Sequence, residues 1–186
     1  MRTLSVLRDP PPSRKAINTQ ILAWNSGIIV EAITRELERN GQVLFLHNRV
    51  TSLAGTAEEL VRMCGPKLKP ILLHGQMAGH EIEDALIAFR EGHGNCLVST
   101  TVIENGVNFL RANTIIIDHA DEFGLAQLHQ LRGRVGRSDK SAYALLLYRK
   151  AFLAEDAKKR LLAIAEHSEL GAGFEIALRD LEIRGA

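Results

Sequence analysis

Two arginines separated by two residues carry the most specific chemistry in this sequence. Arg134 and Arg137 stand in the segment Gln130-Leu-Arg-Gly-Arg-Val-Gly-Arg137, where Gly133 and Gly136 allow a turn and close backbone approach. Guanidinium groups are always charged and match phosphate oxygens in pairs, so two of them on one turn can converge on a small anion. An arginine that stabilises a γ-phosphate during transfer contributes about 10³ to 10⁵ in rate. The alternative is a surface helix end with arginines near its negative pole.

Alternating apolar runs and amphipathic segments surround these arginines and must position them. The run Val43-Leu-Phe-Leu46 is too short for a helix and lacks alternation, as a strand covered on both faces would be. The segment 27–40 reads as an amphipathic helix, with Ser26 as N-cap and Gly41 just past its end. The same reasoning predicts strands over 17–24, 70–74, 96–99, 114–118 and 142–148, and helices over 52–64, 81–91 and 124–132.

Strands that alternate with helices predict an α/β fold, a mostly parallel sheet with helices on both faces. Polar residues at 47–49, 74–76, 100–101 and 118–119 each follow a predicted strand, and the carboxyl ends of parallel strands are where chemistry gathers. Beyond residue 154 the strand signal stops, and helical patterns over 154–167 and 174–181 predict a C-terminal helical hairpin. We divide the chain into a linker (1–16), a sheet domain (17–150) and the hairpin (151–186).

Composition narrows the class of protein. Of the 186 residues, 46% are hydrophobic and 24% charged, which is typical of a folded globular chain. The formal net charge of +1 argues against a surface that grips nucleic acid everywhere, so a nucleic-acid site must be local. Cys64 and Cys96 form no CxxC pair and favour reduced thiols in the cytosol. No apolar stretch reaches the ~18 residues of a membrane span.

One apparent motif is rejected, and no metal site is expected. The apolar run 115–117 ending in Asp118 resembles a strand with a magnesium-binding acid. The sequence contains no GxxxxGK[ST] phosphate loop, so Asp118 is interpreted as a strand-end loop residue. The seven histidines show no metal-ligand spacing.

The arginine segment matches the motif VI pattern QxxGRxGR of superfamily-2 helicases. Residues 43–48 stand where motif IV would, and residues 98–106 where motif V would. The wider run 123–137 resembles both the transcription-repair coupling factors (Mfd) and the related RecG helicases, and the segments 170–174 and 180–186 resemble a translocation motif that the two share. The connector at 9–19 and the segment 119–124 resemble Mfd, which makes it the closer match. The resemblance covers nearly the whole chain. It implies the second RecA-like lobe of a DNA translocase, with part of a translocation motif in the hairpin.

The resemblance also implies roles for individual residues. Arg134 and Arg137 would reach the γ-phosphate of an ATP that, with its magnesium ion, is held mainly by a first lobe. Gln130, Gly133, Gly106 and Asn108 would contact the nucleotide; Asn108 stands where Asp is common and brings no charge. Gly75, Thr100 and Thr101 would hold the DNA backbone without reading sequence. Arg184 would touch DNA or relay the nucleotide state.

The resemblance to this family also implies a function for the whole protein. That function is DNA-dependent ATP hydrolysis coupled to translocation on double-stranded DNA in the bacterial cytoplasm, which displaces stalled RNA polymerase and recruits excision repair. RNA polymerase and UvrA would bind through other domains, and no membrane partner is expected. The fragment alone is expected to be inactive. Two alternatives stay open: the lobe of a RecG-type fork-reversal helicase, and a module with the same fold that binds without catalysis.

Overall fold

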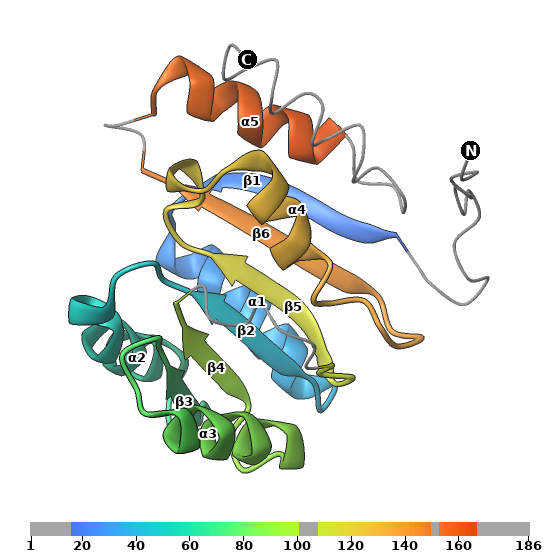
Figure 1. The fold of residues 1–186 in the computed structure, drawn as a ribbon. Coiled ribbons are helices and arrows are strands. Elements are labelled where there is room, and N and C mark those ends of the chain that lie inside the picture. Colours follow the sequence, from blue (N-terminus) through green and yellow to red (C-terminus); the bar gives the residue numbers. More distant parts are fainter. Residues whose placement is uncertain (1–15, 101–107, 150–152, 167–186) are drawn as a thin grey trace, which may run out of the picture.

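The computed structural model describes residues 16–100, 108–149 and 153–166. A sheet of six strands in the order β1-β6-β5-β2-β4-β3 forms the centre of the molecule (Figure 1). All neighbouring strands pair in parallel, so they end at one edge of the sheet, the carboxyl edge, and begin at the other, the amino edge. The strands are β1 Ile17–Ala23, β2 Gln42–Leu46, β3 Pro70–Leu73, β4 Cys96–Ser99, β5 Ala112–Ile117 and β6 Ala142–Tyr148.

Helices cover both faces of the sheet, which confirms the predicted architecture. The helices α1 and α2 cover one face, and α3, α4 and α5 cover the other (Figure 1). Apolar residues of the first two helices pack in one core cluster, and those of the other three pack in a second. These helices are α1 Ser26–Glu38, α2 Val50–Cys64, α3 Gly79–Glu91, α4 Leu125–Arg132 and α5 Glu155–Glu166, with a short 3₁₀ helix η1, Ala120–Glu122, before α4.

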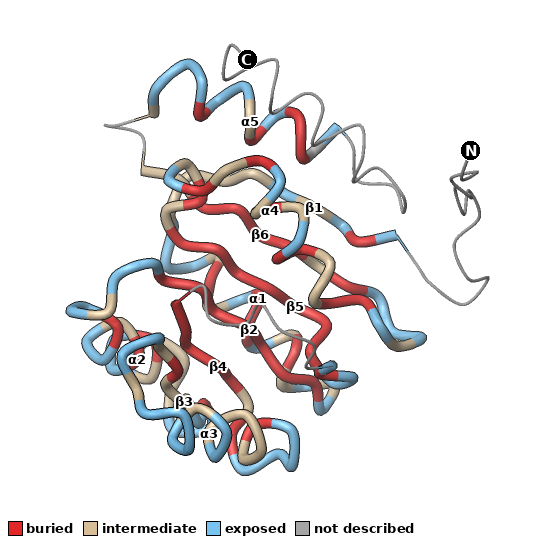
Figure 2. The backbone as a smooth tube through the Cα atoms, in the orientation of Figure 1, coloured by how far each residue is buried: buried red, intermediate tan, exposed pale blue. Residues whose placement is uncertain are grey.

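The central strands are buried along their whole length. Every residue of β2, β4 and β5 is buried (Figure 2), which explains their continuous apolar runs in the sequence. On the α3 side, the rings of Phe89 and Phe109 meet edge to face at a centroid distance of 5.0 Å. This aromatic contact fixes the loop before β5 onto α3.

The helix α1 begins one residue before the predicted range 27–40 and ends two residues before its end. Asn25 is the N-cap in place of Ser26, and its Oδ1 accepts a hydrogen bond from the Ile28 N–H at 3.2 Å. At the other end Asn40 takes the left-handed conformation (φ 58°) that was assigned to Gly41. Position 41 requires glycine for a different reason, because the buried Glu36 carboxylate occupies the space that a β-carbon would need.

Other element boundaries move by a few residues. The helix α2 begins at Val50, two residues before the prediction, and α3 begins at Gly79 because the Glu81 carboxylate accepts the Ala78 N–H at 2.7 Å. The first helix of the predicted hairpin is present as α5. The second hairpin helix (174–181) and nearly all of the linker lie outside the described residues, so the domain divisions stay predictions.

Candidate functional site

Residues 133–137, which we call the finger loop, follow directly from α4. Leu125, Leu128 and Leu131 anchor that helix in the core, and Val135 is buried within the loop itself. Because α4 crosses back over the sheet between β5 and β6, it delivers the finger loop to the amino edge.

The turn of the finger loop depends on Gly136. Its φ is 76°, a conformation that residues with a side chain rarely adopt. A β-carbon there would lie 3.2 Å from side-chain atoms of Ala142 and Ile17, the first residues of β6 and β1. The glycine therefore permits both the turn and its close seat on the two strands.

The structure brings three of the predicted nucleotide-site residues together. The exposed Arg137 side chain donates through Nε to the Gly133 carbonyl at 3.3 Å and through Nη1 to Asn108 Oδ1. Arg134 is half-buried, and Gln130 is exposed on α4. Gly106 lies outside the described residues. Arg137, Gly133 and Asn108 thus form one cluster that joins the segment after motif V to motif VI.

Sequence reasoning missed Arg132, which stands between the predicted residues. Its side chain is buried, and Nη1 donates to the Ile164 carbonyl of α5 at 3.0 Å while Nη2 lies 3.0 Å from His129 Nδ1. Burial lowers the pKa of this guanidinium from its ordinary value. Arg132 therefore connects the end of α4 to α5.

The predicted DNA-contacting residues lie at the other edge of the sheet. Thr100 follows β4 directly and is 7% exposed, and its N–H donates to the Leu73 carbonyl at 3.1 Å. Gly75 is exposed two residues after β3. Thr101 and Arg184 lie outside the described residues. Gly75 and Thr100 thus share the carboxyl edge, while the finger loop occupies the amino edge.

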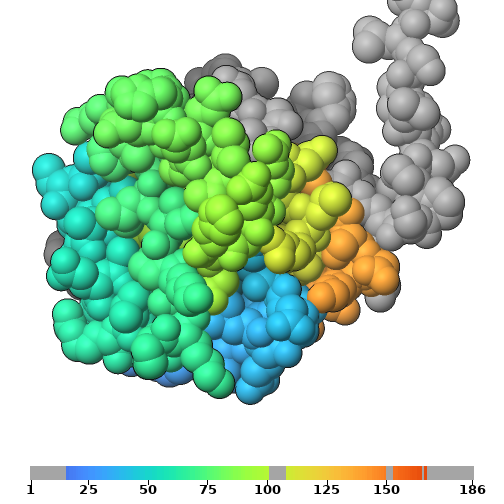
Figure 3. Space-filling view, turned by 90° about the horizontal axis from the view of Figure 1, so that it is seen from below, coloured from blue at the N-terminus to red at the C-terminus, as the bar shows by residue number. Residues whose placement is uncertain are grey.

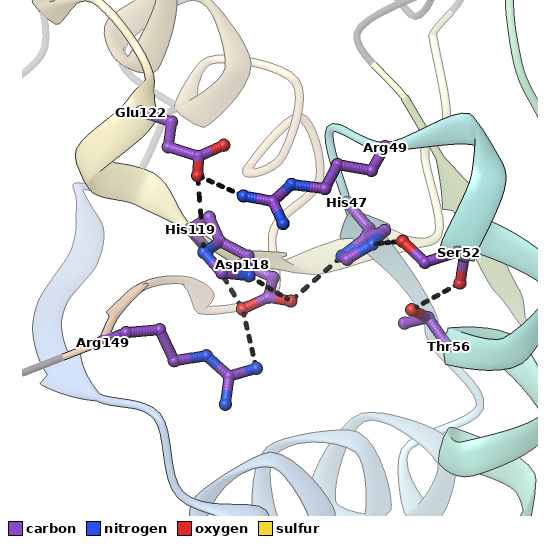
Figure 4. A network of polar contacts seen from close by, with 8 residues as sticks. All are labelled: His47, Arg49, Ser52, Thr56, Asp118, His119, Glu122 and Arg149. Atoms are coloured by element: carbon purple, nitrogen blue, oxygen red, sulfur yellow. Dashed lines mark hydrogen bonds and ion pairs between the residues drawn. The ribbon is translucent and has the colours of Figure 1, made fainter. Parts of the chain in front are cut away.

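A network of polar side chains around Asp118 also occupies the carboxyl edge (Figure 4). His47 Nδ1 lies 3.0 Å from Asp118 Oδ2, and His47 Nε2 lies 2.6 Å from Ser52 Oγ. Although burial raises the pKa of Asp118, the hydrogen bond from His47 and the nearby charges of His119 and Arg149 together hold it below its ordinary value. The polar clusters that follow β2 and β5 signalled this proximity, but the sequence did not show which atoms would pair.

A pocket of about 1020 Å³ opens beside this network, between the ends of β1, β5 and β6. Trp24 and Tyr148 line it, and the guanidinium carbon of Arg149 lies 4.5 Å from the centroid of the Trp24 ring system. This pocket and the finger loop are at opposite edges of the sheet, so they do not form one site.

Over the described part of the chain, no group of three or more His, Cys, Asp or Glu side chains is arranged to hold a metal ion. In the same ranges, no helix is both long and apolar enough to cross a membrane.

Residues 27–139 match the helicase conserved C-terminal domain. This range contains the finger loop at the amino edge of the sheet and also Gly75 and Thr100 at its carboxyl edge. The chain belongs to this family. Transcription-repair-coupling factors are similar to it over its whole length: that of Bacillus subtilis is 49% identical over 187 residues, and that of Staphylococcus aureus is 47% identical. The chain spans 16% of the length of each of these relatives.

Solved structures agree with this assignment. A RecG bound to a three-way DNA junction superposes with a TM-score of 0.81 and 36% identity, over 95% of this chain and 23% of that one. Dbp5 of S. cerevisiae, bound to RNA and ADP BeF3, shares the fold at 16% identity, with a TM-score of 0.61 over 90% of this chain and 45% of that one. The lobe is therefore a RecA-like helicase C-terminal domain, as predicted.

Proposed function

We propose that this helicase domain is the second ATPase lobe of a double-stranded DNA translocase that acts in transcription-repair coupling. The observation that carries the proposal is the finger loop, in which the exposed Arg137 is held by Gly133 and Asn108 rather than left to sample many directions. Whole-chain similarity to transcription-repair-coupling factors supports the assignment to that pathway.

In this proposal Arg137 and Arg134 reach the γ-phosphate of ATP, while a separate lobe with a phosphate loop holds the rest of the nucleotide and its magnesium ion. ATP hydrolysis supplies the free energy. The residues present fit the task, since Asn108 is a neutral acceptor and leaves the positive charge of Arg137 undiminished. The sequence contains no phosphate loop of its own, so the two lobes must act together.

Duplex DNA would lie at the carboxyl edge, against Gly75 and Thr100. Thr101 and Arg184, which lie outside the described residues, would be further contacts. The exposed Gly75 offers close backbone approach, and threonine hydroxyls can hold phosphates without reading bases. Separation of the two edges supports the proposal, because one lobe could then contact nucleotide and DNA at the same time. Displacement of stalled RNA polymerase and recruitment of UvrA would depend on other domains of a longer protein in the bacterial cytoplasm.

A RecG-type fork-reversal lobe is the second candidate, and the structural similarity to RecG favours it specifically. The two candidates differ in what the longer protein acts on. A coupling factor should release stalled RNA polymerase from DNA, whereas a fork helicase should convert branched DNA without polymerase. A module that binds without catalysis is the third candidate.

The central experiment measures ATP hydrolysis by the full-length protein with and without duplex DNA. We expect DNA-stimulated turnover in the wild type, its loss by about 10³-fold or more in Arg137→Ala, and none from residues 1–186 alone. Robust turnover by residues 1–186 would contradict the two-lobe proposal. Unchanged turnover in a full-length variant with charge reversal at both Arg134 and Arg137 would favour the binding module.

A further inference from the structure

The segment directly after the finger loop is tied to the start of β5. Ser138 Oγ donates a hydrogen bond to Asn113 Oδ1 at 2.8 Å, although the two residues are 25 positions apart. The start of β5 and the loop before β6 lie side by side at the surface (Figure 3, yellow and orange). This bond is separate from the Arg137–Asn108 contact, so two links join the same pair of segments.

Asn113 makes a rigid anchor for this bond. The residue is 1% exposed and lies within β5, and its Nδ2 donates to the Arg111 carbonyl at 3.3 Å. Both ends of the Asn113 amide are thereby engaged, which fixes its orientation. The Ser138 hydroxyl also accepts the Lys140 N–H at 3.3 Å, so it holds the turn that leads into β6.

The bond is placed where it controls the direction of Arg137. Ser138 is the next residue, and on the other side Gly136 is seated against Ile17 and Ala142. The backbone of Arg137 is therefore held from both sides. Asn108, which contacts the guanidinium itself, precedes Phe109, whose buried ring meets the Phe89 ring edge to face.

We propose that Ser138 and Asn113 are positioning residues for Arg137, and that their hydrogen bond sets the direction of the guanidinium relative to the transferred phosphoryl group. This inference rests on the proposed function, because it assigns these two residues to the same ATP site. Neither residue touches the nucleotide. They act through the backbone at 137–138, where a small rotation moves the guanidinium at the end of a long side chain by much more.

The direct test removes the hydroxyl in the full-length protein and measures ATP hydrolysis at saturating duplex DNA. Ser138→Ala should lower kcat roughly 10- to 100-fold, because misplacing a catalytic group by about 1 Å costs on that order. The KM for ATP and the affinity for duplex DNA should stay unchanged. Turnover is divided by the stoichiometry of nucleotide binding, so that an unfolded fraction does not count as lost catalysis.

Matched variants separate positioning from a general structural effect. Ser138→Thr keeps the hydroxyl and should recover most of the lost kcat. Thr56→Val removes another hydroxyl, which donates to the Ser52 carbonyl far from the finger loop, and should leave kcat unchanged. A Ser138→Ala protein with wild-type kcat, or one that Ser138→Thr does not rescue, overturns the proposal.

A double-mutant cycle tests the bond itself. Because Ser138 and Asn113 act through one hydrogen bond, Ser138→Ala combined with Asn113→Ala should lower kcat no further than the more damaging single change. Effects that multiply overturn the assignment. If Asn113→Ala fails to fold, Asn113→Leu takes its place in the cycle, because it removes the Oδ1 acceptor and nearly keeps the side-chain volume.

The inference and the proposed function fail in different ways. Full ATP hydrolysis by Arg137→Ala removes the role of the arginine, and with it the proposed function. Loss of hydrolysis in Arg137→Ala together with unchanged kcat in Ser138→Ala leaves the function standing and removes only the positioning role of the Ser138–Asn113 bond.

Discussion

His47 and Asp118 connect the ends of neighbouring strands β2 and β5 through a contact of 3.0 Å between Nδ1 and Oδ2. The carboxylate also lies 3.8 Å from Arg149 Nη2, at the end of β6. Three strands of the sheet thus meet at one buried acid, which makes the carboxyl edge sensitive to the charge of Asp118.

The ionised Asp118 carboxylate should contribute to the free energy of unfolding in a way that depends on pH. Its pKa is lower in the folded protein than in the unfolded chain, so the stabilisation is present above about pH 3.9, the ordinary aspartate value. It should disappear as the pH falls through the lower, folded pKa. Urea unfolding of wild type and Asp118→Asn across this range should give a stability difference that shrinks towards low pH. A difference that does not change with pH in this window would contradict the assignment.

Substitution by alanine should change the free energy of unfolding in opposite directions at Gly41 and Gly55. At Gly41 a β-carbon would lie 1.7 Å from Oε1 of Glu36, whose fully buried carboxylate binds Arg39 and Thr114. Gly41→Ala should therefore lower the free energy of unfolding by about 1–3 kcal/mol, as overpacking a buried site does.

Gly55 is the matched control for Gly41. It is exposed within α2 and has open space around the position of a β-carbon. Gly55→Ala should raise the free energy of unfolding by about 0.5–1 kcal/mol, because glycine is the poorer helix residue. Denaturant midpoints of both variants measure the contrast; equal losses at the two positions would be inconsistent with the packing of Glu36.

Removal of the Arg132 side chain should weaken the link between α4 and α5. In Arg132→Met the Ile164 carbonyl loses its guanidinium donor, at a cost of about 1–3 kcal/mol for a buried unpaired group. Amide hydrogen exchange should quicken in α5 more than in α1, which packs on the opposite face of the sheet. Uniform quickening across both helices would instead indicate a general loss of stability.

Loss of the Thr100 hydroxyl should weaken binding to duplex DNA without changing the sequence preference. If its hydroxyl holds a phosphate, Thr100→Val in the full-length protein should reduce duplex affinity by about 1 kcal/mol, near the usual contribution of one hydrogen bond. Titrations with two unrelated duplex sequences measure this loss. A loss confined to one sequence, or none at all, would remove Thr100 from the DNA site.

The sheet could be predicted from the sequence because its central strands are buried on both faces and read as unbroken apolar runs. Helix ends were less predictable for a local reason. Asn25 and Ser26 are adjacent and both are good N-cap residues, as Asn40 and Gly41 are both able to take positive φ. Packing of the Glu36 carboxylate against Gly41 involves a contact that no local pattern reveals.

The sequence indicated residues for the candidate site, whose roles stay predictions, but not the geometry of that site. Motif spacing identified Arg134 and Arg137, and the crossover through α4 explains why they lie at the amino edge rather than with the polar clusters at the carboxyl edge. The Ser138–Asn113 bond could not be predicted, because it depends on how the start of β5 and the loop before β6 meet in space.

The seat of Gly136 on Ile17 and Ala142 has a mechanical consequence. Strands β1 and β6 pair in parallel over seven residues, from Ile17 with Ala142 to Ala23 with Tyr148. Tension applied along the chain through residue 16 therefore loads this ladder in shear, so its hydrogen bonds must yield together rather than one by one. The point where that tension enters, Ile17, is also the point on which the arginine turn rests.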